Sequence, residues 1–437
     1  LVESGPAGGA IFAADIAARH GLDRVLSFDM GGTTAKICLI KDQTPKTARV
    51  FEVARSYRFK KGSGMPISIP VIDMVEIGAG GGSLAHVDAL RQIRVGPESA
   101  GSEPGPACYG RGGDRPAVTD ADLILGKLDP DDFAGGSIAL SPDASEAALA
   151  AHVGDTLNMS AEEAAWGVAE VVDENMANAA RVHAVENGED LADYTMIAFG
   201  GAAPLHAARL CEKLGIDRCL VPQGAGVGSA IGFLRAPFSF EATRSVFMRM
   251  TDFDGAAIRA LFADLRSEAE GFVRTCAPDD AILTEHKVYM RYAGQGWEIP
   301  VALPKALAQG PDAAAILALF EAEYAKLFSR TVAGLPVEAT VWAVNAATER
   351  PAPVRAAEAR ARPAPEAQAI RRLFDSSTAK PVDATVHARA ALSPGTDAPG
   401  PALVTEAETT AIVPSSRHVR ALGDGTLDLY RPGSEAP

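Results

Sequence analysis

The sequence predicts an α/β domain, then an α+β domain, then a small C-terminal β domain. Short apolar runs alternate with helical patterns over residues 1–235, and longer strands and amphipathic helices follow over 236–350. Short alternating strands separated by turn residues recur over 370–437. A stretch rich in Pro, Ala and Arg predicts a linker over 351–369.

The composition is that of a packed protein with an acidic balance. The chain has 437 residues, of which 47% are hydrophobic and 22% are charged, and its formal net charge is -15. An acidic surface disfavours binding to nucleic acid or to an anionic membrane. The five cysteines are scattered without a C-x-x-C pair, which argues against a disulfide framework or a thiolate zinc site. We therefore expect reduced thiols, a cytoplasmic setting and no membrane span.

The first residues predict close helix packing. The chain starts at Leu1 without a methionine and enters a structured-looking segment at once, so we expect further chain upstream. Gly5-Pro6-Ala7-Gly8-Gly9 then opens a helix that runs from Ile11 to His20, with small residues on one face. Packing against another helix is the expected role of that face.

The stretch Phe28-Asp29-Met30-Gly31-Gly32-Thr33-Thr34 predicts a tight turn between two strands, 24–27 and 35–40. Adjacent glycines let the backbone approach a ligand and reach positive φ, while the threonine hydroxyls and turn amides can face an anion. Asp29 can hold Mg²⁺ or orient a nucleophile at the lip of this turn. The alternative is an ordinary hairpin whose Asp caps its own turn.

A second chemical stretch runs from Asp73 to Asp88. Residues 78–82 are all Gly or Ala, which predicts that the backbone passes close to a neighbouring group. Asp73 and Glu76 precede this run and His86 follows it, a set that suits a metal site or an acid–base pair. The alternative for His86 is a structural histidine with satisfied hydrogen bonds.

Two other stretches allow either a chemical role or a role without chemistry. The basic stretch Arg55–Gly64 either steers an anionic substrate or forms a solvated loop. Cys108, in a long Gly- and Pro-rich loop, is either a nucleophile or a buried inert thiol. The stretch after this loop predicts a helix over 121–127 with Thr119 or Asp120 as its N-cap.

A second glycine turn is predicted further along the chain. Residues 194–199 form an apolar strand, and Gly200-Gly201-Ala202-Ala203-Pro204 lead from it into a helix. A strand, a double glycine and a helix N-terminus together are typical of anion or nucleotide sites. Residues 224–232 then repeat the small-residue helix pattern of the first residues.

The motifs together resemble the hydantoinase A/5-oxoprolinase family, in an N-methylhydantoinase A-like form. The motifs that carry the resemblance are SGPAGG, FDMGGTTAK, IDMVEIGAGGGS, VTDADL, AFGGAAPLHA and PQGAGVGSAIG. They cover nearly the whole span to residue 235, with one departure at Ala203, where the family has glycine. The resemblance implies an α/β lobe like the second lobe of the actin, sugar-kinase and Hsp70-like ATPases.

The resemblance also implies site residues and cofactors, namely ATP and Mg²⁺ or another divalent cation. From the residues themselves, Asp29, Asp73 and Glu76 are the catalytic candidates, and Asp29 and His86 are the metal candidates. The phosphates are expected at Gly31, Gly32, Thr33 and Thr34, and the adenosine at Gly200, Gly201 and Ala202.

The implied function is that of an ATP-dependent hydrolase subunit. It is expected to open a cyclic amide (a hydantoin, 5-oxoproline or a similar lactam) through a phosphorylated intermediate. The implied partners are a hydantoinase B-type subunit and an N-terminal lobe of the same chain that carries the first phosphate loop. One alternative is the ATP-using subunit of an acetone- or acetophenone-type carboxylase. An alternative of another class is a nucleotide-binding structural or regulatory subunit without chemistry of its own.

Overall fold

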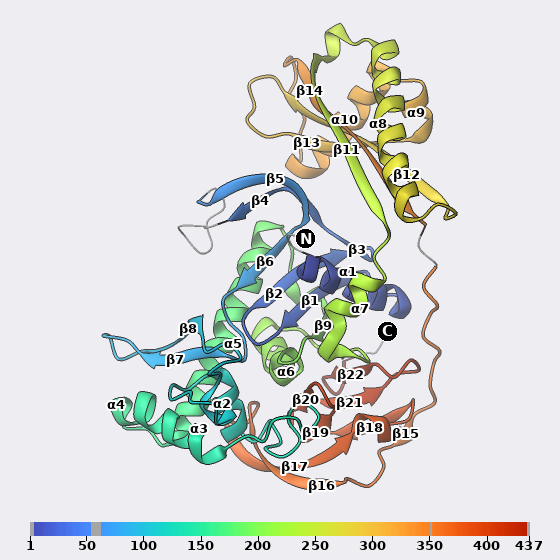
Figure 1. Ribbon diagram of the computed structural model, residues 1–437. Helices are drawn as coiled ribbons and strands as arrows, with labels where there is room; N and C mark the ends of the chain where they lie inside the picture. Colours follow the sequence, from blue (N-terminus) through green and yellow to red (C-terminus); the bar gives the residue numbers. More distant parts are fainter. Residues whose placement is uncertain (1–3, 54–62, 350–351, 435–437) are drawn as a thin grey trace. The chain divides into compact units, whose positions relative to one another are not determined.

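The computed structural model describes residues 4–53, 63–349 and 352–434, and these form two compact units. The first unit combines Leu1–Ala236 with Pro353–Pro437, and the second is Pro237–Ala352 (Figure 1). Most of the basic stretch Arg55–Gly64 lies outside the described residues.

A mixed sheet forms the centre of the first unit. The strand β1 (Arg24–Met30) pairs antiparallel with β2 (Ala35–Lys41), which confirms the predicted hairpin. On its other edge β1 pairs parallel with β9 (Thr195–Phe199), and β9 pairs parallel with β10 (Arg218–Val221). The strand β6 (Met74–Ile77) adds to β2. The apolar residues of β1, β2 and β9 are almost fully buried, so this sheet carries the main core.

Two helices with small residues pack directly on each other. They are α1 (Ser4–His20) and α7 (Gly228–Leu234), and they lie beside β1 and β9 (Figure 1). A Cβ atom added to Gly232 would stand 1.9 Å from the carbonyl oxygen of Gly8, so the two backbones touch. The predicted packing role of these small residues is confirmed.

Longer helices cover the sheet and its insertions. The helix α5 (Ala161–Glu186) is capped by Ser160, whose hydroxyl accepts a hydrogen bond from the amide of Glu163. The helix α6 (Ala203–Leu214) follows β9 and packs on α5. The shorter helices are α2 (Val118–Ile124), α3 (Pro142–Leu149) and α4 (Asp155–Leu157).

The predicted cap of α2 was wrong. Ala117 takes the capping position, and Asp120 lies inside the helix, where Oδ2 of its carboxylate accepts a hydrogen bond from the amide of Ala117 at 2.7 Å. An acidic residue in the first helical turn stabilises the unpaired amides there, so the stretch still starts a helix for the expected physical reason.

Smaller strand pairs extend from this unit. The paired strands are β4 (Thr47–Val53) with β5 (Met65–Ile72), β7 (Ser83–Val87) with β8 (Ile93–Ser99), and the edge strand β3 (Thr44–Pro45) with β2.

The C-terminal segment does not form the separate domain that the sequence predicts. Its last strand, β22 (Leu427–Tyr430), pairs antiparallel with β10 and so extends the central sheet. The expected linker over 351–369 packs too, because β15 (Arg362–Pro363) pairs with β18 (Thr396–Pro399). Strand patterns show which residues pair but not with which sheet, and without β22 the edge of β10 would be open.

The rest of this segment divides between two sheets. The strand β21 (His418–Ala421) lies between β18 and β22 in the central sheet. The strands β16 (Ala369–Asp375), β17 (Lys380–Ala388), β19 (Ala402–Thr405) and β20 (Thr410–Val413) form a four-stranded sheet of their own.

The second unit is an antiparallel sheet covered by helices. Its strand order is β11 (Ser239–Arg249), β14 (Val337–Thr348), β12 (Ile282–Tyr292) and β13 (Ile299–Leu303). The helices are α8 (Gly255–Cys276), α9 (Lys305–Gln309) and α10 (Ala313–Phe328). The fully buried Trp342 lies at the core, where its Nε1 donates to the carbonyl of Val246 and Phe262 packs edge-on against its ring.

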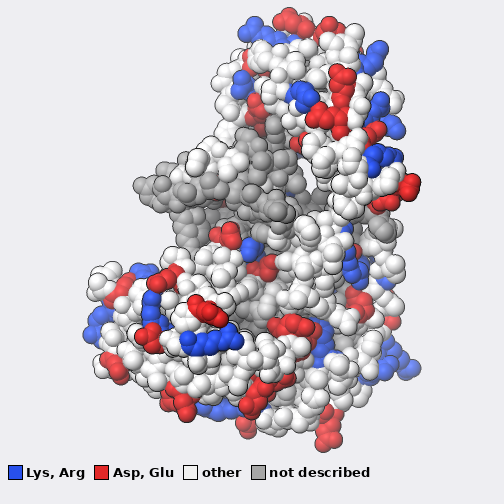
Figure 2. All heavy atoms as spheres, viewed as in Figure 1, with Lys and Arg blue, Asp and Glu red and all other residues white. Residues whose placement is uncertain are grey.

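Charges of both signs are interspersed over the face drawn in Figure 2. No broad basic area appears among the described atoms of that view, which agrees with the net charge of -15. In the described part of the chain, every helix is too short or too polar to cross a membrane.

The packing of α1 on α7 predicts different effects of alanine at two positions of one helix. A Cβ atom at Gly8 would stand 2.3 Å from the carbonyl oxygen of Ser229, whereas one at Gly5 would meet nothing within 4 Å. We expect Gly8→Ala to lower the free energy of unfolding by about 1–3 kcal/mol because the helices must separate. Urea denaturation measures this effect. Gly5→Ala is the matched control and should stay within about 0.5 kcal/mol of wild type. Equal effects of the two changes would contradict the close approach.

Candidate functional site

Two glycine turns lie side by side where β1 and β9 end. The two strands are parallel, and their register pairs Asp29 with Phe199, so both chains leave the sheet at the same edge. The amide of Ala202 donates to the carbonyl of Met30 at 3.0 Å. Gly200 has a φ of +93°, and a Cβ atom there would stand 2.4 Å from the same carbonyl oxygen. Residue 200 must therefore be glycine for the turns to meet.

Asp29 stands between the two turns. Its carboxylate accepts a hydrogen bond of 2.6 Å from the hydroxyl of Ser229, which lies in α7. A Cβ atom at Gly200 would stand only 2.7 Å from Oδ1 of Asp29. Burial raises the pKa of Asp29, while the hydrogen bond from Ser229 and the charge of Lys36 oppose the rise. The carboxylate is thus held in a fixed position next to both turns.

Asp29, Lys36 and Glu76 form a row across three neighbouring strands. Lys36 is directly opposite Asp29 on one side and Glu76 on the other, and directly opposite residues share a face of the sheet. The ammonium of Lys36 donates to the hydroxyl of Thr34 at 2.8 Å and lies 3.7 Å from Oε1 of Glu76. A cation therefore stands beside the first glycine turn, where it can attract an anion.

The first turn presents open backbone. Neither Gly31 nor Gly32 has a positive φ, so that part of the prediction was wrong. A Cβ atom on either residue would meet nothing within 4 Å among the described residues. Thr33 is exposed as well. Because the space over the turn is free of side chains, a ligand can approach the backbone closely.

The glycine run 78–82 is hydrogen-bonded to the backbone of this turn. The amide of Gly81 donates to the carbonyl of Gly31 at 3.0 Å, and the amide of Gly82 donates to that of Gly32 at 2.7 Å. A Cβ atom at Gly80 would stand 2.6 Å from the amide nitrogen of Thr33. The predicted close approach of this backbone is confirmed, and the neighbouring group is the first turn itself.

The structure does not bring Asp73 to the site. The strand β6 runs antiparallel to β2, so Ile77 lies opposite Ala35 next to the turn and Asp73 lies beyond the far end of the strand. Its carboxylate is 3.8 Å from the ammonium of Lys46. Glu76, three residues later, is the acid that the register brings near the first turn.

His86 also lies elsewhere. It is an exposed residue of β7, opposite Arg94 on β8, in a separate two-stranded sheet. Among the residues that the structure describes, no group of three or more His, Cys, Asp or Glu side chains could hold a metal ion. His86 therefore has no ligand set around it in the described chain.

Cys108 is a buried thiol rather than an exposed nucleophile. It is fully buried, and burial together with the neighbouring Asp120 raises its pKa well above the ordinary range. The carboxylate of Asp120 is occupied by the amide of Cys108 at 2.7 Å and by the hydroxyl of Ser145 at 2.7 Å. The alternative of an inert thiol thus holds for this residue.

A pocket of about 310 Å³ opens beside the second turn. Two segments, 128–134 and 405–410, line it together with Gly201. The hydroxyl of Thr409 donates to the carbonyl of Gly201 at 2.9 Å, so the turn between β19 and β20 lies against the glycine turn. Phe133 gives the pocket an aromatic wall, and Asp129, Asp132, Glu406 and Glu408 give it carboxylates. Such a lining suits a ring that donates hydrogen bonds better than it suits a phosphate.

The side chain of Ala203 does not face an open site. It is fully buried at the start of α6 and belongs to the main core.

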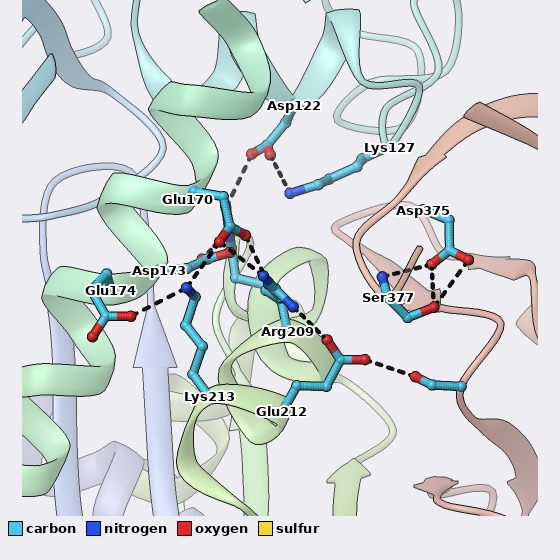
Figure 3. A network of polar contacts seen from close by, with 12 residues as sticks. Asp122, Lys127, Glu170, Asp173, Glu174, Arg209, Glu212, Lys213, Asp375 and Ser377 are labelled. Atoms are coloured by element: carbon cyan, nitrogen blue, oxygen red, sulfur yellow. Dashed lines mark hydrogen bonds and ion pairs between the residues drawn. The ribbon is translucent and has the colours of Figure 1, made fainter. Parts of the chain in front are cut away.

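A buried group of charges includes Asp122, Lys127 and Asp173 (Figure 3). His206 is fully buried between two carboxylates, with Nε2 3.1 Å from Asp122 and Nδ1 2.8 Å from Asp173. The ammonium of Lys127, also buried, lies 2.8 Å from Asp122. Burial opposes the charge on His206, but Asp122 and Asp173 outweigh it and raise its pKa to about 9. Burial likewise opposes the charge on Asp122, but His206 and Lys127 lower its pKa to about 2.

Sequence reasoning missed several of these residues. Ser229 is one hydroxyl in a glycine-rich helix, and Lys36 is found only by counting the register of the hairpin from its turn. Asp122 and Asp173 come from different helices, and no local pattern joins them to His206.

Comparison with known families identifies the architecture. Residues 1–242 match the family model described as hydantoinase/oxoprolinase, and residues 251–427 match the model of the hydantoinase/oxoprolinase C-terminal domain.

Two relatives illustrate the similarity. The chain is 32% identical over 435 residues to the caprolactamase alpha subunit of Pseudomonas jessenii, covering 98% of this chain and 61% of the relative. It is 28% identical over 430 residues to the acetone carboxylase beta subunit of Xanthobacter autotrophicus, covering 94% of this chain and 58% of the relative. The chain thus spans only 58–61% of the length of the first curated relatives it matches.

Two solved structures have a similar fold. A nucleotide-free acetone carboxylase structure matches with a TM-score of 0.80 and 25% identity, and the ATP-dependent caprolactamase of Pseudomonas jessenii matches with 0.77 and 29%. Each match covers 98% of this chain and 61% of the solved chain.

The buried charges predict how stability depends on pH. His206 has its pKa raised from 6.5 to about 9, so its contribution to stability is complete below pH 6.5 and is lost as the pH rises through about 9. Asp122 has its pKa lowered from 3.8 to about 2, so its contribution is lost as the pH falls below 3.8 toward 2.

We expect the free energy of unfolding of the wild type to fall by an amount on the order of 3 kcal/mol across the alkaline window because of His206. Denaturant titrations at a series of pH values from 6 to about 10.5 measure it. In His206→Gln this part of the decline should disappear. The same alkaline decline in both proteins would show that His206 is not its source.

Proposed function

Because the chain belongs to the hydantoinase/oxoprolinase family, we propose that it is the ATP-using part of an enzyme that opens a cyclic amide. The substrate class is a hydantoin, 5-oxoproline or a similar lactam. The observation that carries this proposal is the meeting of two glycine turns around one held carboxylate, Asp29. The ATP dependence of the similar caprolactamase supports it.

We assign the first unit to the second lobe of an actin-like ATPase. An antiparallel hairpin followed by parallel strands, each leading into a helix, supports this assignment, as do the paired helices α1 and α7. The opposing lobe, with its own phosphate loop, then completes the cleft.

The residues present fit a nucleotide. Gly31, Gly32, Thr33 and Thr34 offer open backbone and hydroxyls to the phosphates, and the space over the two glycines is free of side chains in the described chain. Gly200, Gly201 and Ala202 flank the adenosine. Lys36 supplies a positive charge at the phosphate end, while the carboxylates of the pocket beside Gly201 disfavour phosphate there.

Asp29 fits the position of a Mg²⁺ ligand. Mg²⁺ is usually held by one or two carboxylates, by phosphate oxygens and by water, so a single well-placed carboxylate suffices. The hydrogen bond from Ser229 and the charge of Lys36 favour the ionised form of Asp29 against the effect of its burial. Glu76 lies next in the row and holds Lys36.

The chemistry explains why ATP is needed. An amide carbon is a poor electrophile, because its nitrogen donates electron density to the carbonyl group. Transfer of the γ-phosphoryl group to the amide oxygen releases ADP and activates this carbon. One water then adds to the carbon and the C–N bond breaks, with a proton going to the nitrogen. A second water releases inorganic phosphate and leaves the open amino acid. We propose that a B-type partner subunit shares this work.

A carboxylase subunit is the second candidate. The acetone carboxylase beta subunit and the acetophenone carboxylase gamma subunit are both similar to this chain. In that case the phosphoryl group goes to the oxygen of an enolate, and the same two turns bind ATP.

Substrate-dependent ATP turnover tests these assignments. With the full natural chain and its partner subunit, we expect ADP release to rise at least about tenfold on addition of caprolactam, 5-oxoproline or hydantoin. Coupled assays with each compound measure the rise. Stimulation only by acetone or acetophenone with bicarbonate would favour the carboxylase. Binding of ATP·Mg²⁺ without turnover on any compound would favour a subunit without chemistry of its own.

The role of Asp29 is tested by Asp29→Asn. The amide keeps the shape but loses the charge that faces Mg²⁺, so we expect ATP turnover to fall by about 100-fold or more. Steady-state kinetics with Mg²⁺ measures the loss. The control is Asp193→Asn, since Asp193 is an exposed carboxylate paired with Arg24 at the other end of β1. Turnover close to wild type in Asp29→Asn would remove Asp29 from the site.

A further inference from the structure

A closed ring of contacts joins the two glycine turns by way of α2. Its first half starts at the first turn, where the carbonyl of Gly31 accepts from the amide of Gly81 at 3.0 Å. The carbonyl of Gly81 in turn accepts from the amide of Thr119 at 2.7 Å and from its hydroxyl at 2.8 Å. Thr119 is the second residue of α2, so this helix is tied to the first turn at its start.

The second half of the ring runs from α2 to the second turn. Asp122 lies three residues after Thr119, and its carboxylate contacts Nε2 of His206 at 3.1 Å. His206 lies in the first turn of α6, which begins at Ala203 directly after the second glycine turn. The amide of Ala202 then donates to the carbonyl of Met30, which closes the ring beside Gly31.

The contact between Asp122 and His206 depends on a charged imidazole. Both ring nitrogens of His206 face a carboxylate, Asp122 on one side and Asp173 on the other, so each nitrogen must carry a hydrogen to donate. Lys127 supplies the second positive charge, and the four groups together are neutral. All four are buried.

The other elements packed on α6 bring no further charge to His206. Among the described residues, β9 and β20 carry no ionisable side chain. Other charged side chains nearby have partners of their own: Glu170 binds Arg209 and Lys213, Arg218 binds Asp428, Arg24 binds Asp193, and Asp29 binds Ser229. The protonation of His206 is therefore governed by Asp122, Asp173 and Lys127.

We propose that the Asp122–His206 contact positions the second glycine turn against the first, so that Asp122 and His206 are positioning residues of the ATP site. The inference rests on the proposed function. It follows from the geometry, because α6 is a rigid continuation of the second turn and α2 is anchored to the first. A shift of the turns by about 1 Å is enough to weaken binding and catalysis strongly.

The test measures the dissociation constant of ATP·Mg²⁺ by titration calorimetry from pH 6 to 10, in the full natural chain with its partner subunit. We expect wild type to lose affinity as the pH rises through about 9, where His206 loses its charge. In Asp122→Asn the imidazole loses a counter-ion, so this alkaline loss should shift to lower pH. In His206→Gln we expect affinity about tenfold weaker at pH 7, as for one lost charged hydrogen bond, and without the alkaline loss that His206 causes.

Two further variants separate positioning from stability. Asp428→Asn removes a buried carboxylate that pairs with Arg218 outside the ring, so it should lower the melting temperature and leave the affinity for ATP and its pH profile unchanged. Thr119→Val removes the hydroxyl bond to Gly81 at the other anchor of the ring and keeps the amide bond and the shape of the side chain. It should weaken ATP binding without moving the pH at which the affinity falls. Should Asp122→Asn or His206→Gln fail to fold, Thr119→Val and the wild-type profile still test the inference.

Two outcomes are decisive. Variants that lose stability but keep both the affinity for ATP and its loss at alkaline pH would overturn the inference alone. They would leave the proposed function standing. Absence of ATP·Mg²⁺ binding by the wild type at every pH would overturn the proposed function, and the inference with it.

Discussion

The parallel pairing of β1 with β9 is the constraint on which the site depends. It sets Asp29 beside Phe199, and from this register the two glycine turns must emerge together at one edge of the sheet. The contact of Gly200 with the carbonyl of Met30 leaves no room for a side chain. The helices α1 and α7 then approach closely enough for Ser229 to reach Asp29.

Charge is distributed in two ways around these turns. In front of them, Lys36 stands in a row with Asp29 and Glu76, partly open to solvent, where it can meet an anionic group. In the interior of the first unit, charges of both signs are buried and paired, as His206 is between Asp122 and Asp173. Buried pairs of this kind contribute little net stability over apolar packing, but breaking one leaves an uncompensated charge and is costly. A different arrangement of α2, α5 and α6 would leave one of these charges without its partner.

Features set by neighbouring residues could be predicted from the sequence, and features set by pairing between distant segments could not. The hairpin around Gly31 and the strand, glycine turn and helix at 195–214 follow from local periodicity and turn residues. Whether Asp73 or Glu76 reaches the turn depends on the register of β6 on β2, which no local pattern encodes. The pairing of β22 with β10 is equally non-local, so the C-terminal strands were predicted as a domain of their own. The group around His206 was missed for the same reason, since Asp122, Asp173 and His206 lie on three different helices.

The pairing of β10 with β22 also affects how this protein folds during its synthesis. Arg218 and Asp428, which join the two strands, are 210 residues apart, and the whole second unit lies between them in the chain. At a synthesis rate of roughly 5–20 residues per second, the edge of β10 waits roughly 10–40 s on the ribosome for its partner strand. During that interval it is an open template for pairing with other chains, while the second unit has time to fold. Production of the protein in cells is therefore expected to depend on chaperones that shield this edge until β22 emerges.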